Sequence, residues 1–220
     1  MSTYKTSAAR ETILKKIRVA LQEESVAKPY PDLGKIAVKE LYHMDNDADL
    51  ATIFASEFTQ AGGKFVFCND MTDFIAQLNA LVVAKEWNHI LCAQKDLFSY
   101  LINSKVPYVL EADPKKDQSP ACITDCELAV ARTGSFIFSS QQHLGRTAPI
   151  FFPCHIIVVQ PHQVVADISD ALKMMKQKYN NQLPSMINLN TGPSRTADIE
   201  KTLVTGVHGP KEIYCFWIND

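Results

Sequence analysis

Residues 190–200, NTGPSRTADIE, follow an apolar run at 186–189 and form a loop of small residues. Apolar residues at helical spacing after the loop predict a short helix capped by Thr196, and GVHGP at 206–210 predicts a turn before a last strand. A strand, a small-residue loop and a helix N-terminus would expose backbone N–H groups that can hold an anion. Gly-Pro-Ser is also an ordinary turn, so the residues alone leave both interpretations open.

Composition and charge narrow the class of protein around this loop. The 220 residues are 46% hydrophobic and 21% charged, which is typical of one large globular domain or of one domain with a small extension. The net charge of −2 does not indicate a nucleic-acid surface. No apolar run is long enough for a membrane span, and residues 1–5 contain no secretory signal, so we expect a cytoplasmic protein.

The cysteine pattern argues against a metal centre in this chain. The six cysteines are Cys68, Cys92, Cys122, Cys126, Cys154 and Cys215. None forms a C-x-x-C pair, so neither a zinc ribbon nor a ferredoxin-type cluster is indicated. We expect reduced, mostly buried thiols and no bound metal or cofactor.

The hydrophobic pattern divides the chain into two different parts. Residues 6–24 have the periodicity of a helix with Ser7 as a possible cap, and 27–45 form a Pro- and Gly-containing linker. We therefore expect an N-terminal helix and linker over 1–45 and an α/β domain over 46–220. The predicted strands are 64–68, 89–93, 108–110, 155–159 and 212–218, and the predicted helices are 49–60, 70–85, 96–103 and 164–179. Alternation of this kind predicts a Rossmann-like, mainly parallel sheet flanked by helices.

The middle of the chain departs from this alternation. Residues 123–131 and 135–138 read as a hairpin around Thr133 and Gly134, although a helix over 125–131 is an open alternative. Residues 141–153 form a polar loop without a clear element, and this loop carries Arg146. Arginine-bearing loops of this length between core strands are often functional.

Three of these pieces are candidates for one binding site. We expect them to meet at the carboxyl ends of the parallel strands, where α/β sheets place ligands. The candidate ligand-binding residues are Thr133, Gly134, Ser135, Arg146, Thr191, Gly192, Ser194, Arg195 and Thr196. Their arginines, hydroxyls and N–H groups suit a carboxylate or phosphate. Neither a G-x-G-x-x-G nor a P-loop pattern is present, so a dinucleotide site is unsupported.

Titratable residues add candidates for proton chemistry. Glu127 could act as a nucleophile or base, or be an ordinary polar residue at a strand edge. His208 lies between glycines and is the more accessible histidine, whereas His155 opens an apolar strand and reads as a hydrogen-bonded core residue half enclosed by its neighbours. We expect Arg146, Arg195 and His208 to converge on one pocket beside Thr133.

Two segments resemble the lactate utilisation protein C family, whose members are LUD-domain proteins. They are ITDCELAVARTGSFIFSS at 123–140 and TGPSRTADIEKTLVTGVHGPKE at 191–212, and PCHI at 153–156 and Arg146 also match. The resemblance implies a fold similar to the NagB/RpiA/CoA transferase-like group. Members commonly carry an acidic residue before the Thr-Gly pair, where this chain has Arg132, and this departure bears on any acid–base role there.

The same resemblance implies a function. Family members are implied to act in the oxidation of L-lactate to pyruvate, beside two cysteine-rich partners that carry iron–sulfur clusters. We therefore expect a subunit without a cluster that binds a small anion such as lactate or pyruvate. Two alternatives stay open: a stand-alone isomerase or CoA-transferase-like enzyme that uses Glu127, and a regulatory ligand-binding module.

Overall fold

The computed structural model describes residues 8–22, 49–113, 119–199, 202–206 and 208–219. The chain divides into two compact units, Met1–His43 and Met44–Asp220. Within the first unit the described element is α1 (Ala8–Ala20), which lies inside the predicted helix. The expected cap Ser7 and the expected linker at 27–45 lie outside the described residues.

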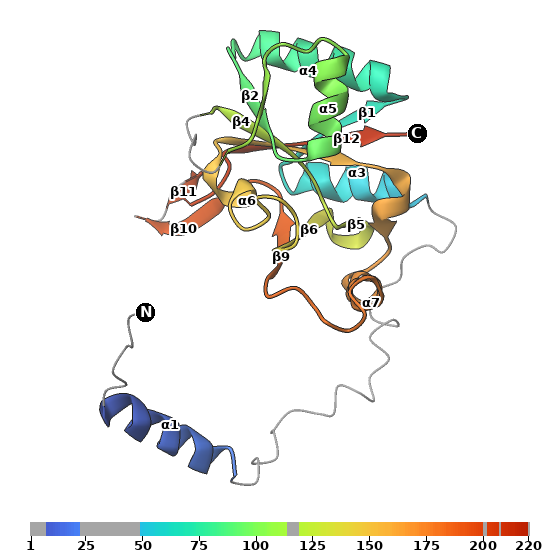
Figure 1. Ribbon diagram of the computed structural model, residues 1–220. Helices are drawn as coiled ribbons and strands as arrows, with labels where there is room; N and C mark the ends of the chain where they lie inside the picture. Colours follow the sequence, from blue (N-terminus) through green and yellow to red (C-terminus); the bar gives the residue numbers. More distant parts are fainter. Residues whose placement is uncertain (1–7, 23–48, 114–118, 200–201, 207, 220) are drawn as a thin grey trace. The chain divides into compact units, whose positions relative to one another are not determined.

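A six-stranded parallel sheet forms the centre of the second unit (Figure 1). Its strands, in spatial order, are β1 (Lys64–Cys68), β12 (Glu212–Ile218), β7 (Cys154–Val159), β4 (Ala121–Asp125), β2 (Ile90–Cys92) and β3 (Val109–Glu111). Every neighbouring pair runs parallel. The predicted α/β class with a mainly parallel sheet is therefore confirmed.

The central strands are mostly apolar, and both of their faces are buried. Successive side chains of a strand point to opposite faces, so a doubly covered strand reads as one hydrophobic run. In β12, Tyr214, Phe216 and Ile218 pack in one core cluster, whereas Ile213, Cys215 and Trp217 pack in another. This division shows that the sheet separates two hydrophobic cores.

Different elements cover the two faces of the sheet (Figure 1). The helices α4 (Met71–Ala84) and α5 (Lys95–Asn103) pack on one face through residues such as Phe74 and Leu101. On the other face α3 (Leu50–Gln60) buries Phe54 and Phe58. Asp49 and Asp70 are the N-caps of α3 and α4 and accept hydrogen bonds from backbone N–H groups of the first turns.

A second sheet completes the core beside α3. It consists of β8 (Val164–Val165), β5 (Leu128–Val130), β6 (Ser135–Ser139) and β9 (Ile187–Thr191), in that order. The expected hairpin exists as the antiparallel pair β5 and β6, so the helical alternative for 125–131 is wrong. The predicted first arm at 123–131 is not one strand, however, because its first residues belong to β4 of the parallel sheet. The helix α7 (Ile168–Lys178) covers the outer face of this sheet. The predicted helix at 164–179 is thus shorter, because Val164 and Val165 pair with β5.

The helix predicted after the loop at 190–195 is wrong. The chain instead forms an antiparallel pair, β10 (Arg195–Ile199) and β11 (Thr202–Thr205). This segment is rich in threonine, isoleucine and valine, whose branched side chains favour strands, and short apolar runs do not separate helix from strand. No helix dipole therefore contributes to an anion site at Thr196. The loop at 141–153, expected without an element, contains the short helix α6 (Ala148–Phe151).

Candidate functional site

One cavity, here called the amino-end cavity, lies beside the start of β12. It has a volume of about 580 Å³ and includes Pro210 and Ile213 in its wall. Its polar lining residues are Asn188, Asn190, Thr191, Ser194, Arg195 and His208. Among the described residues that line it there is no aspartate or glutamate, whereas Arg195 is a cation.

Backbone contacts hold the loop of this cavity in place. Ser194 N–H donates to Pro210 O at 3.0 Å, and Gly206 N–H donates to Ser194 O at 3.0 Å. Gly192 has a φ of +65°, and a Cβ there would lie 2.4 Å from Ala61 O. Because only glycine fits both the dihedral angle and the space, the loop packs directly against the end of α3.

Arg195 is the fixed cation of the amino-end cavity. Its Nη2 donates to Ala61 O at 2.8 Å, while the residue stays exposed. Ala61 is the C-cap of α3, where the helix dipole favours a positive charge. The guanidinium has five N–H donors in total, so this anchor leaves donors for a ligand.

Three hydroxyl groups connect the β5–β6 turn to the same loop. Ser135 Oγ lies 2.6 Å from Thr191 Oγ1 and 2.8 Å from Thr133 Oγ1. Ser135 and Thr191 face each other across the β6–β9 pair, which explains the contact. The structure therefore brings Thr133, Gly134 and Ser135 beside the Thr191 loop, although the sequence places them more than fifty residues apart.

The expected location of the site is wrong in two respects. The Thr191 loop lies at the amino end of the parallel sheet rather than at the carboxyl end, because it packs on the segment that leads into β12. Arg146 donates from Nη2 to Ser185 Oγ at 2.6 Å and does not line the amino-end cavity. Arg195 and His208 therefore share this cavity without Arg146. Thr196 lies in β10, and its side chain is outside the described residues.

His155 is a core residue, as the sequence suggested, but it is fully enclosed rather than half enclosed. Its ring has no exposed surface and packs against Phe138, and its Nε2 lies 2.8 Å from Thr124 Oγ1. Burial lowers the pKa of His155 to about 3, so the ring is neutral near pH 7.

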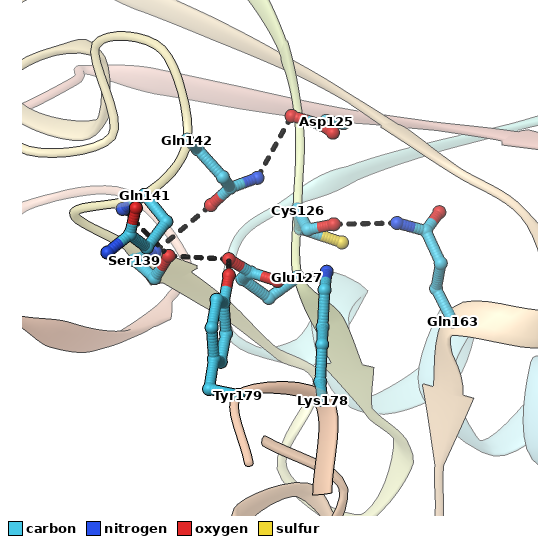
Figure 2. Close-up of polar contacts among 9 residues, drawn as sticks. All are labelled: Asp125, Cys126, Glu127, Ser139, Gln141, Gln142, Gln163, Lys178 and Tyr179. Atoms are coloured by element: carbon cyan, nitrogen blue, oxygen red, sulfur yellow. Dashed lines mark hydrogen bonds and ion pairs between the residues drawn. The ribbon is translucent and has the colours of Figure 1, made fainter. Parts of the chain in front are cut away.

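A second cavity of about 690 Å³ lies at the opposite, carboxyl end of the sheet and is here called the carboxyl-end cavity. Asp125 and Ile218, the last residues of β4 and β12, line it together with Glu127. Figure 2 shows Ser139, Lys178 and Tyr179 converging on Glu127. Lys178 Nζ lies 2.6 Å from Glu127 Oε2, and Tyr179 Oη and Ser139 Oγ both donate to Oε1.

These contacts decide the charge of Glu127. Burial raises the pKa of this carboxyl, but the hydrogen bonds from Lys178, Ser139 and Tyr179 outweigh burial and lower the pKa below its ordinary value. The Glu127 side chain is only 1% exposed and both of its oxygens are occupied. Glu127 therefore joins α7 to the second sheet, and its oxygens are poorly placed to attack a ligand.

Asp125, which sequence reasoning missed, is more accessible than Glu127. It is half-buried, and Gln142 Nε2 donates to its Oδ1 at 2.9 Å (Figure 2). Burial raises the pKa of Asp125, an effect that Gln142 opposes and the charge of Glu127 reinforces. The signal in the sequence was an acidic residue two positions after the apolar run at 121–123, at the end of a strand, where parallel strands present ligand-binding side chains.

Arg132, the residue before the Thr-Gly pair at 133–134, forms an ion pair. Arg132 Nη2 lies 2.8 Å from Asp167 Oδ1, and Asp167 is the N-cap of α7. The arginine thus ties the β5–β6 turn to the start of α7, and its hydrogen bond, helped by its charge, holds the pKa of Asp167 below the ordinary value.

All six cysteines are buried free thiols. Among the described residues, no group of three or more His, Cys, Asp or Glu side chains is arranged to hold a metal. No described helix is long and apolar enough to cross a membrane.

The fold defines an α/β protein in which a six-stranded parallel sheet packs against a second, mixed sheet. A family model described as the LUD domain matches residues 4–218. The chain therefore belongs to the LUD domain family. A crystal structure of a DUF162 family protein from Deinococcus radiodurans has a similar fold, with a TM-score of 0.53 at 17% identity over 78% of this chain and 99% of that one.

The chain is also similar to bacterial proteins named for lactate utilization. The chain is 32% identical over 108 residues to "Lactate utilization protein C" of Bacillus velezensis, and this match covers 48% of the chain and 45% of the relative. It is 27% identical over 186 residues to the protein of that name from Anoxybacillus flavithermus, covering 78% of the chain and 81% of the relative. The chain thus spans less than half of the length of the first relative, although most of the second.

Proposed function

We propose that this chain acts in lactate utilisation by binding a small organic anion, such as lactate or pyruvate, in the amino-end cavity. The observation that carries the proposal is the charge of the lining: Arg195 and His208 face a space whose described lining contains no carboxylate. Relatives named for lactate utilization support the biological setting.

The polar groups of the amino-end cavity fit a hydroxy acid or a keto acid. A guanidinium binds carboxylates through paired N–H donors, and Arg195 is already oriented by Ala61. Asn188 and Asn190 supply amide donors and acceptors, and Ser194 and Thr191 supply hydroxyls. Such groups can hydrogen-bond a hydroxyl or carbonyl next to the bound carboxylate.

The oxidation itself belongs, in this proposal, to cytoplasmic partner proteins that carry iron–sulfur clusters. The chain has no C-x-x-C pair with which to hold such a cluster. Its own part is to bind and orient the anion. The alternative of a CoA-transferase-like or isomerase reaction through Glu127 is disfavoured because both Glu127 oxygens are occupied by hydrogen bonds.

Calorimetric titration with L-lactate and with pyruvate tests the proposal. The Arg195→Gln variant should fold and lose about 1.5–3 kcal/mol of binding free energy, the usual effect of removing one charged hydrogen-bonded contact. Arg146→Gln is a matched control, because Arg146 is also exposed and bonded to a neighbouring group but lies outside the cavity. Equal affinity in wild type and Arg195→Gln would contradict the proposal.

Growth supplies the biological readout. In a strain that depends on this gene for growth on L-lactate, Arg195→Gln should slow growth at a normal protein level, and Arg146→Gln should not. Normal growth of the Arg195→Gln strain would show that the amino-end cavity is not required for lactate utilisation.

A further inference from the structure

The carboxyl-end cavity lies where open α/β sheets generally place their ligands. Its wall includes the last residues of β4 and β12 and the first residue of α4. Its volume of about 690 Å³ is within the range of small-molecule sites. Met71, Leu97, Val158 and Ile218 form an apolar part of the wall, while Asp125, Gln142 and Lys178 supply polar groups. We infer that this cavity is a second binding site, which takes an uncharged organic molecule bearing hydroxyl groups.

Glu127 orients the donor of this site. Its carboxylate holds Lys178 Nζ at 2.6 Å, and Ser139 and Tyr179 occupy its other oxygen. An ammonium group has three N–H donors, so Lys178 keeps donors beyond the one directed at Glu127. The Lys178 side chain is 59% exposed and lines the cavity, so these donors are accessible.

Asp125 is the acceptor of the site. Gln142 holds Oδ1 at 2.9 Å and is itself fixed, because its Oε1 accepts from Ser139 N–H at 3.0 Å (Figure 2). A carboxylate accepts about four hydrogen bonds, so the bond from Gln142 leaves acceptor capacity for a ligand. Asp125 and Lys178 therefore form a preoriented acceptor and donor in one cavity.

The charges around the cavity select the ligand. Among the described lining residues, the carboxylates of Asp96, Asp125 and Glu127 outnumber the one lysine, Lys178, so an organic anion would be repelled. The Lys178 ammonium likewise disfavours an organic cation beside it, and no described group of three or more ligating side chains would hold a metal. A molecule with several hydroxyls satisfies both polar residues, because one hydroxyl can donate to Asp125 while another accepts from Lys178.

Saturation-transfer NMR and calorimetry with myo-inositol, an uncharged polyol, test this site on the full chain. We expect saturable binding that L-lactate does not displace. Asp125→Ala should weaken it roughly tenfold, since a hydrogen bond to a charged group is lost, and Asp125→Asn should weaken it less. Asp170→Asn is the matched control: it changes an exposed carboxylate of α7 that pairs with Lys173 outside the cavity.

The outcome of the myo-inositol experiment does not depend on whether the lactate proposal is correct. Arg195→Gln should keep myo-inositol binding, whether or not the chain binds L-lactate. Absence of saturable myo-inositol binding, equal binding by the Asp125→Asn variant and the wild type, or displacement by L-lactate would each overturn the inference. Thermal melting of each variant shows whether it is folded. If Asp125→Ala does not fold, Asp125→Asn takes its place in the binding test.

Discussion

Lys178 Nζ lies 2.6 Å from Glu127 Oε2 and so joins the end of α7 to the second sheet. The two side chains differ sharply in environment: Glu127 is 1% exposed and Lys178 is 59% exposed. Removing the lysine therefore leaves a buried carboxylate without its cation, whereas removing the glutamate returns the ammonium to water. Because of this difference, removing Lys178 should cost more stability than removing a lysine from an exposed ion pair.

The Lys178→Met variant should be destabilised by about 2 kcal/mol at pH 7, because a buried charge then lacks its strongest partner. In this variant the pKa of Glu127 should rise. The lowered folded-state pKa of Glu127 in the wild type contributes stability that is complete above the unfolded-state value near 4.5 and is lost as pH falls through the folded-state value. Urea unfolding between pH 7 and pH 3 measures both effects. Lys173→Met, on an exposed pair of the same helix, is the control.

Glu212 predicts a second pH effect, at the amino end of the sheet. Its carboxylate lies within 2.8 Å of both Lys64 Nζ and Lys85 Nζ, and although burial opposes the change, these bonds lower the pKa of Glu212 to about 2. The folded state therefore binds fewer protons than the unfolded state between about pH 4.5 and pH 2, so stability falls across this window as acid is added.

The variant Glu212→Gln should flatten that part of the stability curve. Urea midpoints at successive pH values measure it, and Asp170→Asn, at an exposed pair, should leave the curve unchanged. An identical acid dependence in wild type and Glu212→Gln would contradict the assignment.

His155 should remain neutral in the folded protein throughout the range from pH 5 to pH 8. Burial lowers its pKa to about 3 from 6.5, so the unfolded state binds more protons between these values and stability decreases as pH falls through them. NMR of the imidazole nitrogens checks the prediction directly. The same ring should titrate near its ordinary value in urea-unfolded protein, and titration near pH 6 in the folded protein would exclude the buried, neutral ring.

Gly134 should not tolerate a side chain. Its φ is +56°, and a Cβ there would lie 2.2 Å from Phe58 N, a backbone atom of α3. Left-handed strain costs about 1–2 kcal/mol, and overpacking adds about 1–3 kcal/mol, so Gly134→Ala should be strongly destabilising in urea unfolding. Gly206→Ala, with a φ of +77°, is the comparison variant, because its new Cβ would meet side-chain atoms of Lys211, with Cγ at 2.1 Å, rather than the backbone of a helix. Equal effects at both positions would show that contact with α3 is unimportant.

The sequence by itself determined the class of fold and most of its elements. The strands at 64–68 and 212–218 were predictable as short, continuous apolar runs. The helix at 49–60 was predictable because its apolar residues repeat at helical spacing and Asp49 provides a cap. The second sheet was predicted only in part, as the β5–β6 hairpin. Its pairing with β8 and β9 depends on residues far apart in the chain.

The tertiary structure alone decided the sites. The sequence singled out Arg195, His208 and Ser135, but their grouping arises because β9 pairs with β6 and the loop after it packs on α3. The segment at 195–205 read as a helix, since a short apolar run fits either period and only pairing within the hairpin selects strands. Which residues meet is set by long-range packing, which local periodicity does not encode, and this is why Asp125 was missed and Arg146 was misplaced.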